Sequence, residues 1–199
     1  MQIIVLGAGV VGVTTAYYLC ERGHRVTVVE RADAVATGAS AGNGGQLSYS
    51  FTDAMASPAL LTKIPRMMTG LDPAFFVLPP LDTNLFCWGQ AFLRQCSTHQ
   101  NRQNTIAILQ LALRSDALMA GLRAHTGLEF AFRRAGKLVM LGDHAAMTAA
   151  AQVCTLKRQF GCDARVVTFA EAIAIEPALA HMKNQYAGAV YSENDQVGN

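Results

Sequence analysis

The sequence predicts an α/β fold that opens with a strand, a helix and a second strand in series. Three features predict it: a short β-branched run at residues 2–6, a glycine-rich turn directly after it, and a second apolar run at residues 25–30. About thirty residues are enough for such a βαβ unit, and its parallel strands require a right-handed crossover. The start of the chain therefore predicts a Rossmann-like unit.

The first helix of this unit is expected at residues 10–22, ending at Gly23. Residues 3–20 carry no charge and just reach the length of a membrane span. No Lys or Arg precedes this run, and three glycines and two threonines interrupt it. We therefore expect neither a signal peptide nor a transmembrane helix, and a strand, a turn and a helix instead.

A long loop is expected to follow the second strand. Residues 31–50 are mostly Ala, Gly, Ser, Thr and Asn, and glycine lets a backbone approach a ligand closely. Residues 1–50 are therefore assigned to the N-terminal part of a nucleotide-binding domain.

A helical connecting region is expected at residues 51–127. Four prolines within residues 59–81 indicate a helix followed by an extended segment, and two helices are expected at 83–97 and 103–125. Gly127 ends the second of these helices, which carries apolar residues in helical period at Ile106, Leu109, Leu113, Ala117 and Ala120.

Residues 128–199 are expected to start a second domain of the α+β type. Gly136 joins two expected strands, and Gly161 stops a helix. The expected elements are strands at 130–133 and 137–141, a helix at 143–160, a strand at 165–168, a short helix from Phe169, and a strand at 187–191.

Composition excludes several classes of protein. Of the 199 residues, 51% are hydrophobic and 15% are charged, and the formal net charge is +2. Such a chain is neither disordered nor basic enough to bind nucleic acid. The five cysteines form no Cys-x-x-Cys pair and the five histidines lie far apart, so we expect no metal site. An odd number of reduced thiols is typical of cytoplasmic proteins.

The glycine-rich turn predicts where a nucleotide diphosphate would lie. Gly7 permits the tight turn, Gly9 removes a side chain where the diphosphate approaches, and Gly12 lets the helix pack against the strand. Free N–H groups and the positive end of the helix dipole favour the phosphates. The candidate diphosphate-binding residues are Gly7, Ala8, Gly9, Val10, Val11 and Gly12.

Glu30 closes the second strand and is expected to accept hydrogen bonds from an adenosine ribose. A 2′-phosphate would be repelled there, which disfavours NADP, although the adjacent Arg31 weakens that exclusion. The turn and the acid alone leave FAD and NAD as alternatives, because both present the same ADP half.

From the glycine motif and Glu30 to the loop at residues 40–48, the sequence resembles the FAD-dependent D-amino acid oxidase (DAO) superfamily. It is most similar to the small subunits of bacterial D-amino acid dehydrogenases, which share the Ser-Ala-x-Asn-x-Gly-Gln pattern of this loop. The likeness continues through the turn at residues 134–138 to residues 194–198. The resemblance implies FAD as cofactor, contacted also by Ser40, Asn43, Gly44 and Gly45.

The resemblance further implies oxidative deamination of D-amino acids to 2-oxo acids and ammonia. Relatives that act on glycine, sarcosine, proline or hydroxyproline share this N-terminal architecture, so an FAD-dependent dehydrogenase or oxidase of that kind is an alternative. Family members are about twice as long, so an incomplete fold is expected, and a catalytically inert truncated nucleotide-binding module is a further alternative. The substrate-binding arginine belongs to the other half, and we assign no catalytic residue.

The partners that the resemblance implies are a small amino acid substrate and a respiratory electron acceptor. A cytoplasmic chain is expected, with peripheral contact to the inner face of the plasma membrane as an alternative. Residues 75–78, an aromatic and apolar run, are the segment that would make such a contact or pack in a core. Tyr49 and Phe51 follow the flavin loop and are expected to be packed, with a place in the lining of a substrate pocket as the alternative.

Overall fold

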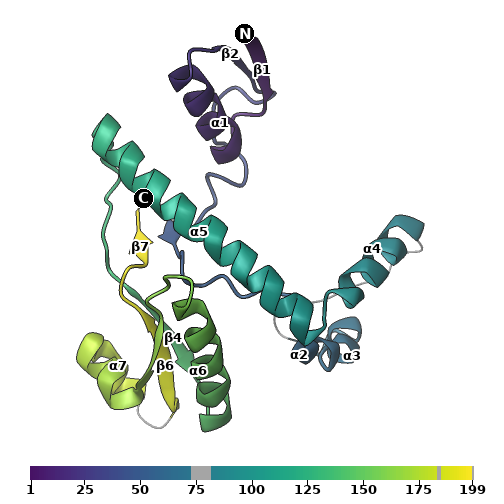
Figure 1. The fold of residues 1–199 in the computed structure, drawn as a ribbon, viewed down its shortest axis with the longest axis vertical. Helices are drawn as coiled ribbons and strands as arrows, with labels where there is room; N and C mark the ends of the chain where they lie inside the picture. Colours follow the sequence, from purple (N-terminus) through teal and green to yellow (C-terminus); the bar gives the residue numbers. More distant parts are fainter. Residues whose placement is uncertain (73–81, 183–184, 199) are drawn as a thin grey trace. The chain divides into compact units, whose positions relative to one another are not determined.

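The computed structural model describes residues 1–72, 82–182 and 185–198 of the chain (Figure 1). Two compact units make up the chain, Met1–Gln46 and Leu47–Gly198. The predicted domain boundaries at residues 50 and 127 stay predictions. The predicted apolar run at residues 75–78 lies outside the described residues.

The first unit is the predicted βαβ unit. Strand β1 (Gln2–Leu6) pairs in parallel with β2 (Arg25–Val29), with Gln2 opposite Arg25 and Leu6 opposite Val29. Helix α1 (Val10–Glu21) connects the two strands and packs against both. The Gly23 N–H bonds to the carbonyl of Cys20, and its φ of +77° ends the helix where the sequence predicted.

The β-branched run of the first strand is typical of a strand that is buried on both faces of a parallel sheet, and this prediction is wrong for β1. Ile4 is 63% exposed and Leu6 is 81% exposed, whereas Ile3 and Val5 on the other face are partly buried. Among the described residues, one helix covers one side of this two-stranded sheet. A parallel sheet that is buried on both sides needs helices on both faces.

The second unit begins with short elements and continues with long helices. Strand β3 (Gln46–Leu47) precedes α2 (Pro58–Leu61), α3 (Ile64–Met68), α4 (Thr83–Arg94) and α5 (Thr98–Thr126). Both long helices occur as predicted, but α5 begins earlier because the Ser97 hydroxyl accepts a hydrogen bond from the N–H of Gln100 and caps it. Gly127, with φ of +63°, ends α5 as predicted.

The predicted apolar stripe of α5 is only partly buried. Leu109 is fully buried and Ile106 and Leu113 are partly buried, but Ala117 and Ala120 are exposed. The two buried residues of α5 are Thr105 and Leu109, so one buried position of this helix is polar and lies outside the predicted stripe. Within the described ranges, α5 is long and apolar enough to cross a membrane, judged by its length and composition alone. The core helix of a soluble protein can have the same length and composition.

A three-stranded antiparallel sheet organises the rest of the second unit. Its strand order is β4 (Lys137–Leu141), β6 (Gly188–Ser192), β5 (Arg165–Thr168). Helices α6 (His144–Arg158) and α7 (Phe169–Ile175) lie on opposite faces of this sheet (Figure 1). A 3₁₀ helix, η1 (Pro177–Met182), follows α7.

Each face of this sheet carries its own apolar cluster. Val190 and Val166 pack with Leu109 and Cys154 on the α6 side. Ala189 and Val167 are packed with Ala172 of α7 on the other. Because neighbouring strand residues point to opposite faces, this alternation buries both sides of the sheet.

The predicted strand at residues 130–133 is wrong. The described chain forms there only a single bridge, between Arg133 and Val197 of β7 (Gln196–Val197). Strand β7 also pairs with β3. Because β7 has two residues, it is too short to form a longer ladder of hydrogen bonds with residues 130–133. The predicted strands at 137–141, 165–168 and 187–191 are confirmed as β4, β5 and β6 with shifts of at most one residue.

Candidate nucleotide-binding site

A pocket of about 870 Å³ opens within the first unit, where β1 and β2 end. Ligands of open parallel α/β sheets bind outside the carboxyl ends of the strands, which is this position. The pocket is lined by the ends of both strands, the glycine turn and the following loop: Leu6, Gly7, Gly9, Val29, Glu30, Arg31, Ala32, Ala36, Thr37, Gly38, Ala39 and Ser40.

The glycines of the turn are required by its geometry. Gly7 has a φ of +94°, in the region that side chains rarely adopt. A Cβ atom at Gly12 would overlap the carbonyl oxygen of Gly7, and a Cβ atom at Gly9 would lie 3.3 Å from the Ser40 hydroxyl oxygen. The turn therefore presents bare backbone to the pocket.

The beginning of α1 offers free hydrogen-bond donors. The Ser40 hydroxyl accepts a hydrogen bond of 2.9 Å from the Val10 N–H. In the part of the chain that the structure describes, the N–H groups of Gly9, Val11 and Gly12 donate to no protein atom. The first turn of α1 contains no acidic side chain. Unpaired N–H groups at the positive end of a helix form a site for an anion such as a phosphate.

Glu30 holds the turn in place through its carboxylate. One oxygen accepts a hydrogen bond of 2.7 Å from the Ala8 N–H, and the other accepts from the N–H groups of Arg31 and Ala32 at 2.8 and 3.0 Å. These donors, Ala8 first, hold the pKa of the Glu30 carboxyl below its usual range. The carboxylate is therefore ionised near neutral pH and faces the turn.

The structure brings together most of the predicted site residues, but not all of them. Gly7, Gly9, Glu30, Arg31 and Ser40 line one pocket, and Ala8 and Val10 bond to its wall. The loop segment with Asn43, Gly44 and Gly45 does not line this pocket; there the Asn43 side chain accepts a hydrogen bond of 2.6 Å from the Gly45 N–H. This bond stabilises a local turn.

Sequence reasoning missed the part of the loop at residues 36–39. Ala36 donates its N–H to the Ala8 carbonyl at 3.0 Å and has a φ of +59°. Thr37, Gly38 and Ala39 then line the pocket. An alanine at positive φ gives no sequence signal, because this conformation is normally marked by glycine or asparagine.

The second unit contains the two aromatic residues that follow the loop. The Tyr49 hydroxyl is buried without a hydrogen-bond partner in the described chain, and burial raises its pKa. Phe51 is 55% exposed, with the Lys137 ammonium 4.6 Å from the centre of its ring, so the expectation that it packs in a core is wrong. Neither side chain identifies a reaction.

The sequence of this chain is similar to a known protein family and to several characterised proteins. The family model described as FAD dependent oxidoreductase (DAO) matches residues 2–199. D-amino acid dehydrogenase 2 of Ralstonia nicotianae is 39% identical over 99% of this chain and 47% of its own length. D-amino acid dehydrogenase of Phenylobacterium zucineum is 34% identical over the whole chain and 46% of its own length. The chain thus spans about half the length of these curated relatives.

Two solved structures share the fold. L-proline dehydrogenase from P. horikoshii matches 99% of this chain and 37% of its own, with a TM-score of 0.65 and 20% identity. Glycine oxidase from Geobacillus kaustophilus matches 98% of this chain and 40% of its own, with a TM-score of 0.62 and 22% identity. At this identity the likeness concerns the fold alone.

Proposed function

The chain belongs to the DAO family of FAD-dependent oxidoreductases, and from this premise we propose that its βαβ unit holds the ADP half of FAD. The observation that carries the proposal is the set of unpaired N–H groups of Gly9, Val11 and Gly12 at the start of α1, of which Gly9 lines the pocket. They would donate to the diphosphate at the positive end of α1. Glu30, at the end of β2, would accept from the ribose.

The remaining predicted residues take supporting roles in this proposal. Ser40 already orders the start of α1 through the Val10 N–H, which fixes the direction of the neighbouring free donors. Arg31 lines the pocket and would add positive charge near the phosphates. Asn43, Gly44 and Gly45 would contact the flavin half, beyond the pocket that holds the ADP half.

The proposed reaction of the whole protein is the oxidative deamination of D-amino acids. Bound FAD would supply the two-electron acceptor for the hydride that leaves the α-carbon of the substrate. The imino acid product would be hydrolysed by water to a 2-oxo acid and ammonia, and a separate acceptor would reoxidise the cofactor. The role of this chain's residues would be to bind and orient the cofactor, because in flavin enzymes the cofactor itself carries out the redox chemistry.

D-amino acids are favoured over glycine or proline by the comparison of sequences. Relatives named D-amino acid dehydrogenase are 31–39% identical over essentially the whole chain. The solved L-proline dehydrogenase and glycine oxidase are 20% and 22% identical and support the fold only.

The experiment that tests this function measures flavin and turnover together. The full-length protein is purified, its bound flavin is extracted and identified, and reduction of an artificial acceptor is followed with D-amino acids, L-amino acids, glycine, sarcosine and proline. We expect bound FAD and fastest turnover with D-amino acids. If the protein binds FAD but prefers glycine or proline, the proposed substrate class is wrong. If it contains no flavin, the proposed function as an FAD-dependent oxidoreductase is wrong. Turnover by the chain Met1–Asn199 alone would exclude an inert module.

A further inference from the structure

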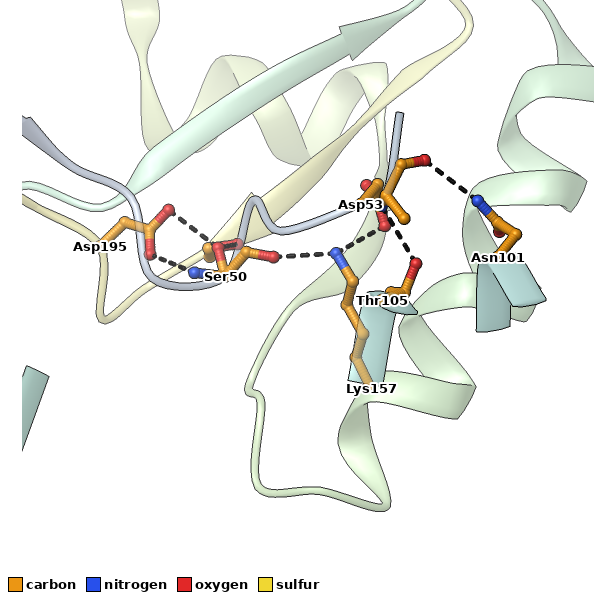
Figure 2. A network of polar contacts seen from close by, with 8 residues as sticks. Ser50, Asp53, Asn101, Thr105, Lys157 and Asp195 are labelled. Atoms are coloured by element: carbon orange, nitrogen blue, oxygen red, sulfur yellow. Dashed lines mark hydrogen bonds and ion pairs between the residues drawn. The ribbon is translucent and has the colours of Figure 1, made fainter. Parts of the chain in front are cut away.

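Lys157 is a buried cation of α6 that the nucleotide site does not use. The residue is 4% exposed. Its ammonium donates a hydrogen bond of 2.9 Å to the Ser50 carbonyl and forms an ion pair of 2.8 Å with Asp53 (Figure 2). Lysine is rarely buried to this extent unless it is paired. Both partners belong to the segment that follows the loop at residues 40–46.

The same segment is fastened at Ser50 by a second buried charge. Asp195, 3% exposed, accepts hydrogen bonds from the Ser50 N–H at 3.0 Å and from the Ser50 hydroxyl at 2.8 Å (Figure 2). The Ser50 hydroxyl also lies 2.6 Å from the hydroxyl of Ser192 in β6. Ser50 is therefore held from two sides, by residues more than a hundred positions further along the chain.

Helix α5 holds the end of the segment. The Asn101 amide donates to the Ala54 carbonyl at 3.0 Å, and the Thr105 hydroxyl accepts from the Ala54 N–H at 3.1 Å (Figure 2). The Asn101 amide also donates to the Ala56 carbonyl at 2.8 Å. Residues 48–57 form no helix or strand of their own. Side chains of other elements thus satisfy backbone groups that a helix or sheet would otherwise satisfy.

A lysine at this place is a poor choice for stability alone. Replacing a buried ion pair by well-packed apolar residues is often neutral or stabilising, so such a pair is weak evidence of a stabilising role. Unlike an apolar side chain, the ammonium makes directional contacts: it binds the Ser50 carbonyl and the Asp53 carboxylate at the same time. It therefore fixes an irregular backbone in one conformation.

We propose that Lys157 is a positioning residue for the cofactor, acting through the segment at residues 50–53. This inference rests on the proposed function, in which the loop at residues 40–45 contacts FAD. Because only β3 and residues 48–49 separate that loop from Ser50, movement of the anchored segment would be transmitted along the backbone to the flavin contacts. Lys157 itself touches neither cofactor nor substrate in this account.

The test replaces Lys157 by methionine in the full-length protein. Lys157→Met keeps an unbranched side chain as far as the Cε position and removes the ammonium with its charge. Arg158→Met changes the next, exposed residue of the same helix as a matched control. Hydrogen exchange of the amides at residues 50–54, the FAD dissociation constant and the absorbance and fluorescence of bound flavin are compared. We expect about tenfold faster exchange and about tenfold weaker FAD binding in Lys157→Met, with a changed flavin spectrum.

Rescue by a conservative variant separates positioning from simple loss of packing. A cavity of about 90 Å³ is lined by Lys157, Ser50 and Asp53, so Lys157→Arg has room for its larger head group. We expect Lys157→Arg to restore the flavin spectrum and the slow exchange. If Lys157→Met does not fold, Asp53→Asn carries the test, because Asp53 is half exposed and its loss leaves the Ser50 bond in place.

The outcomes distinguish this inference from the proposed function. Wild-type protein that never binds FAD overturns both. Wild-type protein that binds FAD, with Lys157→Met or Asp53→Asn showing unchanged exchange and an unchanged flavin spectrum, overturns the positioning role alone. The same changes in Arg158→Met would also overturn it, because they would show a general effect of altering α6.

Discussion

The carboxylate of Glu30 accepts a hydrogen bond of 2.7 Å from the backbone N–H of Ala8. This bond joins the end of β2 to the middle of the glycine turn, across 22 residues of sequence. Because the same carboxylate also binds the N–H groups of Arg31 and Ala32, three of its roughly four acceptor positions are used by the protein. Glu30 therefore orders the turn before any ligand arrives, in addition to its proposed role toward the ribose.

Substituting Glu30 by glutamine is expected to weaken FAD binding. The amide of glutamine turns an N–H₂ group toward at least one backbone N–H, and the negative charge that the three donors stabilise is lost. The dissociation constant for FAD should rise about tenfold to a hundredfold, measured by calorimetric titration of the full-length protein. Glu129→Gln, at an exposed position of the second unit, should leave the constant unchanged.

Substituting Gly12 by alanine is expected to disrupt the first unit. The new Cβ atom would overlap the Gly7 carbonyl, so the turn and α1 must separate, at a cost of about 1–3 kcal/mol in the free energy of unfolding. Gly121→Ala is the matched control, because that helical glycine of α5 has open space around it. Chemical denaturation should show a gain of about 0.5–1 kcal/mol for Gly121→Ala. Equal effects of the two substitutions would contradict the turn geometry.

Acid sensitivity is expected at the start of α7. The backbone N–H and the hydroxyl of Thr168 hold the pKa of the Glu171 carboxyl below its usual range, in a capping box. A carboxyl with a lowered pKa stabilises the fold fully above its unfolded value, about 4.3 for glutamate, and loses that stabilisation as the pH falls through the folded pKa. Stability should therefore decline below about pH 4.3.

Thr168→Ala removes this cap and tests the acid sensitivity. The substitution should cost about 1 kcal/mol near neutral pH and make the decline of stability in acid shallower, measured as the urea midpoint against pH. Thr148→Ala, in the interior of α6, keeps every cap and is the control. A Thr168→Ala profile parallel to that of the wild-type protein would show that the Thr168 hydroxyl does not contribute to the lowered pKa of this carboxyl.

Ser50→Ala is expected to leave a buried carboxylate short of donors. Among the described residues, the Asp195 carboxylate would lose the Ser50 hydroxyl and keep the Ser50 N–H as its donor. Hydrogen bonds to charged groups contribute about 1.5–3 kcal/mol. Chemical denaturation should show a loss of this size, whereas Ser115→Ala on the exposed side of α5 should change little. An unchanged free energy of unfolding in Ser50→Ala would mean that the hydrogen bonds of the Ser50 hydroxyl to Asp195 and Ser192 do not stabilise the segment at residues 50–53.

Local patterns explain why the βαβ unit was predictable. Its strands, its turn and the stop at Gly23 each depend on neighbouring residues, and the acid of the candidate site follows at the end of β2. The sequence predicted Glu30 as a ligand of ribose but not its bond to Ala8, because that bond depends on how the turn folds back.

Long-range contacts explain what the sequence did not predict. The expected strand at residues 130–133 fails because its partner is the two-residue strand β7. The burial of Lys157 and Asp195 was not expected, since charged residues are rarely inside without a partner. Their partners lie 107 and 145 positions away, at Ser50, which no periodicity reveals.

A calorimetric titration that compares FAD with FMN tests the central claim most directly. FMN carries the same flavin but lacks the ADP half, so a site made of the α1 amides and Glu30 should distinguish the two. For the full-length apoprotein we predict saturable binding of FAD, with one molecule per chain, and at least about a hundredfold weaker binding of FMN. Equal affinity for FAD and FMN, or no heat with FAD, would contradict the account.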